Sequence, residues 1–192
     1  MNSFFDILEK LPNLPDDQRK LLEESVKVIK VKKGEVIQQR GDLVRKGYLV
    51  KKGLLRSYSV DAKGKEHIYI FAPEGWIAGG LEFDSENPRT ELFIDALEDS
   101  EVEMANSNLF NHYLSFLDEE ALKVEISRLI RRVSVLQNRV ISLMSSTATE
   151  RYEEFLKTYP QIVQRVPQRM IASYLGITPE ALSKLKGELV RK

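Results

Sequence analysis

The stretch from Gln168 to Lys186 constrains the fold of this chain more than any other part of the sequence. Up to Leu175 it is typical of a short helix that turns Ile171 and Ala172 toward a core. Gly176 follows at once, and glycine takes a positive φ angle in a tight turn without steric cost. The pattern predicts a short helix, a tight turn and the beginning of a second helix.

The second helix of this pair has a well-marked beginning. Thr178 is a natural N-cap, and Pro179 suits the first helical position, where a backbone N–H would have no partner in any case. Leu182, Leu185 and Leu189 then recur on one face and leave polar and basic residues on the others. A plain αα-hairpin shares the turn, but the Thr-Pro start and the basic second helix favour a DNA-binding helix-turn-helix.

The exposed side of the second helix supplies the candidate DNA contacts. Glu180, Ser183 and Lys184 share one face and are predicted to reach base edges, since Glu accepts from cytosine and Lys donates to guanine. Gly187 lies inside this helix and predicts a frayed end from 187 to 192, because an interior glycine weakens a helix. Phosphate contacts are predicted for Arg169, Lys186, Arg191 and Lys192. The predicted DNA-binding residues are Gln168, Arg169, Thr178, Pro179, Glu180, Ser183, Lys184 and Lys186.

Cysteine is absent from the 192 residues, so disulfides, thiolate catalysis and zinc fingers are excluded. A hydrophobic content of 42% is enough for one good core or two modest domains. The first residues lack the basic and apolar regions of a secretory signal, and no apolar run approaches the roughly 20 residues of a membrane span. We therefore expect a soluble cytoplasmic protein with no membrane partner.

The net charge of zero conceals two halves of opposite sign. Residues 1–122 carry 16 Lys and Arg against 23 Asp and Glu, a net charge of −7, and residues 123–192 carry 13 against 6, a net charge of +7. Lysine and arginine gain affinity for nucleic acid by releasing its condensed counterions. A solvated helix face can be basic for other reasons, so the charge supports a phosphate-binding second half without deciding it.

Between about 26 and 104 the sequence changes to short β-branched and aromatic stretches, with glycines at intervals of about 7 to 12 residues. These glycines are Gly34, Gly41, Gly53, Gly64 and Gly75. The predicted strands are Val26–Ile29, Val36–Gln38, Tyr48–Val50, Leu54–Val60, His67–Phe71, Leu92–Ala96 and Glu101–Met104. Regular short strands with glycine turns predict a β-barrel or a jelly-roll-like sandwich. Residues 1 to about 25 predict a helical lead-in, broken between Pro12 and Pro15, that packs on this domain.

A long helix is predicted to follow from Asp118, a suitable N-cap before Glu119 and Glu120. Its apolar residues alternate steps of four and three over three heptads and are Leu122, Ile126, Leu129, Val133, Leu136, Val140 and Leu143. A helix lying on the β domain would show a similar stripe, but the unbroken rhythm favours a coiled coil. We therefore expect this seam to be the interface of a parallel homodimer.

Thr147 and Glu150 are spaced as a capping box and predict a further helix that ends at Tyr159 and Pro160. The predicted fold class is therefore α+β. A β-roll domain with N-terminal helices spans 1–117, a dimerisation helix 118–145, and a helical helix-turn-helix domain 146–192. In the dimer, two recognition helices would read half-sites about one DNA turn apart, roughly 34 Å.

With this arrangement the sequence resembles the Crp/Fnr family of bacterial transcription regulators over nearly the whole chain. The most specific pieces are the run from Gly34 to Gly75, the stretch Ala96–Val102 and the segment from Gln168 to Lys186. The segment Thr149–Tyr152 and the early end after the second helix resemble a short-tailed branch of that family. The resemblance implies a cyclic-nucleotide-binding-like β-roll and a dimer that binds double-stranded DNA, with RNA polymerase as a further candidate partner.

The resemblance also implies an effector pocket, which here departs from the family pattern. In the family, the Glu of a Gly-Glu-Leu turn binds the ribose of a cyclic nucleotide, and an Arg-Ser/Thr pair binds the cyclic phosphate. Arg89 and Thr90 match the phosphate pair, but Gly80 stands where that Glu should be. The effector is therefore expected to be a cyclic nucleotide, a different small molecule or absent. The candidate effector residues are Gly79, Gly80, Leu81, Arg89, Thr90 and Ser134, the last matching hydroxyl residues near the effector base in relatives.

Two other functions are weighed against a DNA-binding regulator. β-Rolls of this kind resemble metal-holding cupins, but the chain has only His67 and His112, on different predicted elements, so neither a metal site nor catalysis is expected. The iron–sulfur branch of the family is excluded by the absence of cysteine. The second alternative is a dimeric sensor or adaptor that has lost DNA binding, for which Gly187 and the short tail are the only support.

Overall fold

The computed structural model describes residues 3–4, 6, 14–44, 46–79, 89–106 and 116–190. The chain forms two compact units. The first consists of Met1–Val60 and Tyr69–Val124, and the second of Asp61–Ile68 and Glu125–Lys192. A short piece of the predicted β domain, Asp61–Ile68, therefore belongs to the same unit as the C-terminal helices.

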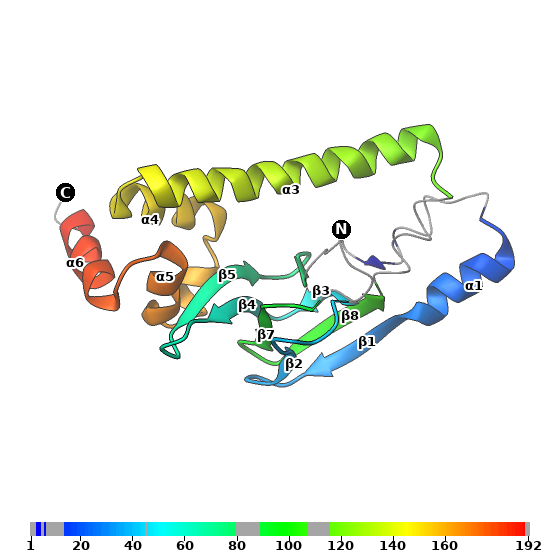
Figure 1. Cartoon of the computed structure of the whole chain (residues 1–192), viewed down its shortest axis with the longest axis horizontal. Coiled ribbons are helices and arrows are strands. Elements are labelled where there is room, and N and C mark those ends of the chain that lie inside the picture. Colours follow the sequence, from blue (N-terminus) through cyan, green and yellow to red (C-terminus); the bar gives the residue numbers. More distant parts are fainter. Residues whose placement is uncertain are drawn as a thin grey trace. The chain divides into compact units, whose positions relative to one another are not determined.

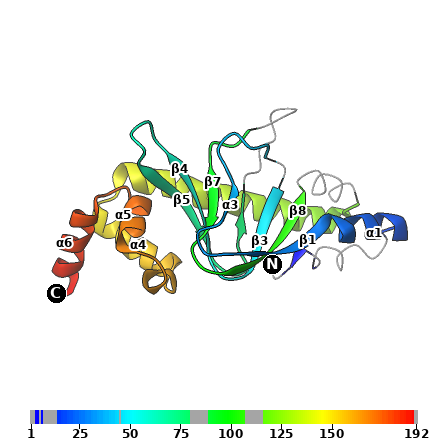
Figure 2. The same cartoon turned by 90° about the horizontal axis from the view of Figure 1, so that it is seen from below.

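Two four-stranded sheets make up the β-roll, in the orders β1-β8-β3-β6 and β2-β7-β4-β5 (Figures 1 and 2). The strands are β1 Val26–Val31, β2 Val36–Gln38, β3 Lys46–Lys52, β4 Leu55–Val60, β5 Glu66–Ala72, β6 Ile77–Ala78, β7 Phe93–Ala96 and β8 Ser100–Asn106. All seven predicted strands are confirmed. The sequence did not predict β6, because two residues are too few to show an alternating pattern. The observed fold is the predicted α+β class with a jelly-roll-like β domain.

The roll encloses an apolar core between its sheets. Val50 of β3 and Val102 of β8 face each other across the antiparallel ladder, and both are at most 1% exposed. Burial of side chains of this size stabilises the fold by about 1.5–3 kcal/mol each. The buried members of the core are Val31, Tyr48, Val50, Leu55, Ala72, Ala78, Ile94, Ala96 and Val102.

The turns of the roll depend on glycine. All five predicted turn glycines have positive φ angles, from 78° at Gly64 to 99° at Gly53. Gly53 has a second reason to lack a side chain, because a Cβ there would lie 2.8 Å from Cα of Ser100. A larger residue at position 53 would therefore force the β3–β4 turn away from the beginning of β8.

A buried ion pair joins β4 to β7. Nε and Nη2 of Arg56 each donate to a carboxylate oxygen of Asp95 at 2.8 Å, and both side chains are at most 10% exposed. The guanidinium also lies 4.1 Å from the ring centroid of Tyr58, which stacks on Phe93. A buried arginine of this kind needs such a bidentate partner, because an unpaired charge in the interior is strongly unfavourable.

The helices begin and end largely as the sequence predicts. Asp118 caps the long helix, since its carboxylate accepts from the Ala121 N–H at 2.8 Å. Thr147 and Glu150 form the predicted capping box. The helices are α1 Asp16–Ser25, α3 Glu119–Ser145, α4 Ala148–Thr158, the 3₁₀ turn η2 Ile162–Gln164, α5 Gln168–Leu175 and α6 Pro179–Val190.

Two expectations at the ends of the chain have different outcomes. α1 confirms the second half of the N-terminal lead-in, whereas residues 7–13 of that lead-in lie outside the described residues. α6 continues through Gly187 as far as Val190, so the expected fraying does not begin at Gly187. Its hydrogen bonds therefore hold that glycine in helix, and Arg191 and Lys192 lie outside the described residues.

Candidate nucleic-acid interface and effector pocket

α5 and α6 form the predicted helix-turn-helix. Gly176 ends α5 in the left-handed region, with φ 69° and ψ 31°. A Cβ at this position would lie 3.4 Å from Cδ2 of Leu143 on α3, so the turn also packs closely against the long helix. The apolar faces of both helices are buried, because Ile171, Ala172, Leu175, Leu182 and Leu185 are at most 6% exposed.

The first turn of α6 is fixed by Thr178 and Glu180. Thr178 Oγ1 accepts from the Ala181 N–H at 3.2 Å, which confirms the predicted N-cap. Bonds from the Glu180 backbone N–H and the Thr178 hydroxyl lower the pKa of the Glu180 carboxyl. In the free chain this carboxylate is therefore turned back onto the beginning of its own helix.

One side of α6 is open and hollowed. The hollow has a volume of about 710 Å³ and contains all three predicted base-contacting residues, Glu180, Ser183 and Lys184. Each of the three is exposed, whereas Lys186 is half-buried. The full lining is Pro179, Glu180, Ser183, Lys184, Gly187 and Glu188.

The first turn of α5 supplies a second exposed set of donors. Gln168 and Arg169 are exposed at this end of the helix. Pro167 occupies the N-cap position and makes no side-chain hydrogen bond to the first turn. The first N–H groups of a helix have no partner within it, so this end can donate to an anion.

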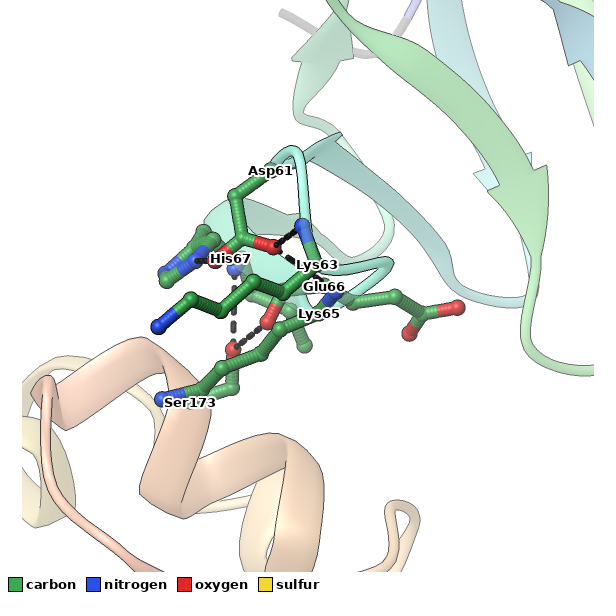
Figure 3. Close-up of polar contacts among 7 residues, drawn as sticks. Asp61, Lys63, Lys65, Glu66, His67 and Ser173 are labelled. Carbon is green, nitrogen blue, oxygen red and sulfur yellow. Dashed lines mark hydrogen bonds and ion pairs between the residues drawn. The ribbon is translucent and has the colours of Figure 1, made fainter.

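Sequence reasoning missed the contact between α5 and the turn that joins β4 to β5. The Ser173 hydroxyl donates to the Glu66 carbonyl at 2.8 Å and accepts from the Ile68 N–H at 3.1 Å (Figure 3). Nη2 of Arg139 donates to the carbonyls of Ile68 at 3.2 Å and Tyr174 at 3.0 Å. No sequence signal indicates these contacts, because Ser173 and Glu66 are 107 residues apart.

Three aromatic rings fix α5 against α4. Phe155, Tyr159 and Tyr174 have ring centroids 5.3–5.6 Å apart, and Tyr159 meets Tyr174 edge to face. Burial raises the pKa of the Tyr159 hydroxyl. The Arg139 guanidinium lies 3.6 Å from the Tyr174 ring centroid and covers this cluster.

The predicted phosphate-binding pair of the effector pocket already has partners within the roll. Nη1 of Arg89 donates to the Gly41 carbonyl at 2.6 Å. Thr90 is only 2% exposed, and its Oγ1 accepts from the Leu92 N–H at 3.0 Å and from Gln38 Nε2 at 3.3 Å. Both members of the pair are therefore engaged in holding two loops of the roll together.

The other candidate effector residues that the structure describes have local surroundings of their own. Gly79 has φ 113°, and a Cβ there would lie 2.8 Å from the carbonyl oxygen of Lys46. The hydroxyl of Ser134 donates to the Ile130 carbonyl of its own helix at 3.0 Å. Gly80 and Leu81 lie outside the described residues.

The predicted seam of α3 is largely open. Leu122, Ile126, Val133, Val140 and Leu143 are 37–62% exposed, whereas Leu129 and Leu136 are half-buried. Five apolar residues outside the predicted seam are also exposed, at 45–83%, namely Val124, Ile130, Val135, Ile141 and Met144. The open apolar surface of α3 is therefore wider than the predicted seam, and its members that are more than half exposed are Ile130, Val133, Val135, Val140, Ile141 and Met144.

No metal or membrane site emerges from the part of the chain that the structure describes. No three His, Cys, Asp or Glu side chains gather there as metal ligands would. His67 lies beside Asp61, with Nε2 2.9 Å from Oδ2, and His112 lies outside the described residues. Within the same residues, no helix has the length and apolar character that crossing a membrane requires.

Comparisons with known proteins agree with this architecture. The sequence model of the cyclic nucleotide-binding domain matches residues 28–115. Regulatory protein HlyX of Actinobacillus pleuropneumoniae is 26% identical over 170 residues, which cover 82% of this chain and 69% of HlyX. The fumarate and nitrate reduction regulatory protein of Vibrio cholerae is 27% identical over 173 residues, which cover 82% of this chain and 66% of that protein. This chain thus spans about two thirds of these relatives.

The fold has a similar counterpart among solved structures. FixK2 from Bradyrhizobium japonicum superimposes with a TM-score of 0.74 at 22% identity, over 86% of this chain and 85% of FixK2. Both curated relatives are named as regulatory proteins, which confirms the expectation of a regulator rather than an enzyme. Its β-roll, its helix-turn-helix and these relatives make the chain similar to transcription regulators of the Crp/Fnr type, with a cyclic nucleotide-binding domain match over residues 28–115.

Proposed function

We propose that this chain is a homodimeric transcription regulator that reads double-stranded DNA with α6 and does not require a cyclic nucleotide. The observation that carries the proposal is the open face of α6, where Glu180, Ser183 and Lys184 are exposed on a helix that is capped at Thr178 and packed against α5. A helix held in this way can enter a major groove without losing its fold.

The two kinds of DNA contact are assigned to different residues. Lys184 and Ser183 reach base edges from the hollowed face, and Glu180 joins them once its carboxylate rotates away from Thr178. Gln168, Arg169 and the uncapped N–H groups of α5 bind phosphates, which fix the position of the protein on the duplex. Lys186 is half-buried and contributes through its charge to phosphate binding.

The DNA assignment is tested with duplexes selected from a random library by the full-length chain. We expect Lys184→Ala to relax base preference at one position in each half-site. Lys186→Ala weakens all duplexes alike and lowers the slope of log Kd against log salt by about 0.9 for each phosphate that the lysine neutralises. Lys157→Ala, an exposed lysine on α4, is the matched control. Equal losses for Lys184→Ala and Lys186→Ala on every duplex would contradict the assignment.

The dimer is proposed to form through the open apolar surface of α3. Val133 is 62% and Val140 55% exposed, and apolar residues so placed gain stability when a second copy covers them. In light scattering, Val133→Asp with Val140→Asp is expected to convert the dimer to a monomer. Asn138→Asp adds a carboxylate at another exposed position of the helix and leaves the dimer intact. A dimer that survives the double change would place the interface elsewhere.

The effector proposal follows from the internal partners of Arg89 and Thr90. A cyclic phosphate would have to displace the Gly41 carbonyl from Arg89 and would find the Thr90 hydroxyl buried and already bonded. We expect calorimetric titration with cyclic AMP, and with cyclic GMP as control, to show no binding. Micromolar binding that Arg89→Ala abolishes would overturn this part of the proposal and make the chain a nucleotide-gated regulator.

A further inference from the structure

The turn between β4 and β5 is closed by hydrogen bonds to its backbone and carries two lysines. Asp61 Oδ1 accepts from the backbone N–H groups of Lys63 at 2.9 Å and Lys65 at 3.0 Å. The Asp61 N–H also donates to the Lys65 carbonyl, and Gly64 completes the turn with φ 78°. The position of both lysines therefore depends on backbone bonds rather than on their own side chains.

The turn separates its charges. Lys63 and Lys65 are exposed and extend toward α5, whereas Glu66 points the opposite way (Figure 3). The Asp61 carboxylate is committed to the two N–H groups and to His67. Among the residues that the structure describes, neither lysine ammonium has a carboxylate partner. Two adjacent cations without such a partner present a net positive surface that suits a phosphate backbone.

The turn is attached to the first helix of the helix-turn-helix. Ser173 of α5 bonds both the Glu66 carbonyl and the Ile68 N–H, and Arg139 bonds the Ile68 carbonyl. Residues 61–68 accordingly form one compact unit with α5 and α6. In both views α5 lies between α6 and the turn (Figures 1 and 2). A duplex bound to α6 and to the first turn of α5 would therefore meet this turn outside the bases that α6 reads.

We propose that Lys63 and Lys65 form a second DNA contact, on backbone phosphates that flank the half-site read by α6. The inference rests on the proposed function, because it presupposes that α6 binds DNA. It gives a segment of the β domain a direct part in DNA affinity. Its contribution is independent of sequence, since lysine on phosphate reads no bases.

The test measures DNA affinity against salt for the full-length chain and for Lys63→Gln with Lys65→Gln. The selected duplex is used in a long form with flanking DNA and in a short form that ends at the two half-sites. On the long duplex we expect the salt slope to fall by about 0.9 for each lysine replaced, which is about 3.6 for the four lysines of a dimer on both half-sites. On the short duplex the variant and the unchanged chain are expected to bind alike.

Two controls separate charge from structure and from general electrostatics. Lys63→Arg with Lys65→Arg keeps both charges and is expected to keep the full salt slope. Lys27→Gln with Lys30→Gln removes the same charge from exposed positions on β1 and is expected to leave the slope unchanged. An equal effect of the β1 variant would overturn the proposal, because only the net charge would then matter.

The failures of the two proposals are distinguishable. If the unchanged chain binds the long duplex and the Lys63→Gln, Lys65→Gln variant keeps its salt slope, the turn makes no DNA contact and only the present inference falls. If the unchanged chain binds no duplex even at low salt, the proposed function falls as well. A fall in affinity that is the same on the short duplex would also overturn the flanking contact.

Discussion

The effector corner of the β-roll and the open face of α6 treat their polar side chains in opposite ways. Arg89 and Thr90 bond to Gly41, Leu92 and Gln38 of their own domain. Ser183 and Lys184 instead line an open hollow. Arg89 and Thr90 match a ligand-binding pattern, but they act as structural residues because their hydrogen bonds are made within the domain. Ser183 and Lys184 are exposed and remain able to contact a ligand.

The largest change in the free energy of unfolding is expected for a substitution of Thr90. Thr90→Val leaves the half-buried Leu92 N–H and the buried Gln38 amide without the Thr90 acceptor, which destabilises the fold by about 1–3 kcal/mol. Ser183→Ala is the counterpart on α6 and is expected to change stability by less than about 0.5 kcal/mol. Chemical denaturation measures both. A Thr90→Val variant as stable as the unchanged chain would remove the structural role of the pair.

Two glycines of the helix-turn-helix are expected to respond with opposite signs. Gly176 has a left-handed backbone, so Gly176→Ala costs about 1–2 kcal/mol. Gly187 lies in helix with no atom within 4 Å of an added Cβ, so Gly187→Ala gains about 0.5–1 kcal/mol. Melting temperatures of the two variants check this. Equal shifts would mean that one of the two backbone conformations is not as described.

Ser173 tests whether the hydrogen bonds between α5 and the β4–β5 turn hold the two together. Ser173→Ala removes the acceptor of the Ile68 N–H, which costs about 1 kcal/mol locally and speeds amide exchange at Ile68 by about fivefold. Ser142→Ala, whose hydroxyl bonds an exposed Glu154, is the control and leaves exchange at Ile68 unchanged. Unchanged amide exchange at Ile68 in the Ser173→Ala variant would mean that this hydrogen bond does not hold the turn on α5.

The smallest expected effect is the titration of Asp61. The bond with His67, together with the N–H groups of Lys65 and Lys63, lowers the pKa of this carboxyl to about 2. A lowered pKa stabilises the turn above the usual value of 3.8, and this contribution is lost as the pH falls through about 2. Carboxyl NMR would follow it, and His67→Gln is expected to raise the pKa. A pKa near 3.8 in the unchanged chain would contradict the turn geometry.

Much of the fold could be predicted because its signals are local. The turn glycines, the Thr147 capping box and the Thr178 cap each act within a few residues of chain, so a short window of sequence reveals them. The same holds for the open face of α6, whose side follows from the period of its leucines. Seven of the strands are likewise visible in alternating or β-branched stretches.

The remaining features depend on contacts between distant parts of the chain. Arg56 and Asp95 are 39 residues apart, and Ser173 and Glu66 are 107 apart, so neither pairing has a signal in sequence. The internal partners of Arg89 could not be foreseen either, because its match to a family pattern says nothing of the Gly41 carbonyl. The approach of Leu143 to Gly176 joins positions 33 residues apart and has no signal in sequence either.

That contact of Leu143 affects how genetic data on this protein should be interpreted. Position 143 belongs to the heptad that predicts the dimer, yet its methyl group lies against the turn that aims α6. A substitution there would lower DNA binding by tilting the recognition helix even in a chain that still dimerises. Loss of regulation in a Leu143 mutant would therefore identify no single defect. A substitution of Val133, which lies ten residues earlier and is 62% exposed, would report on dimerisation alone.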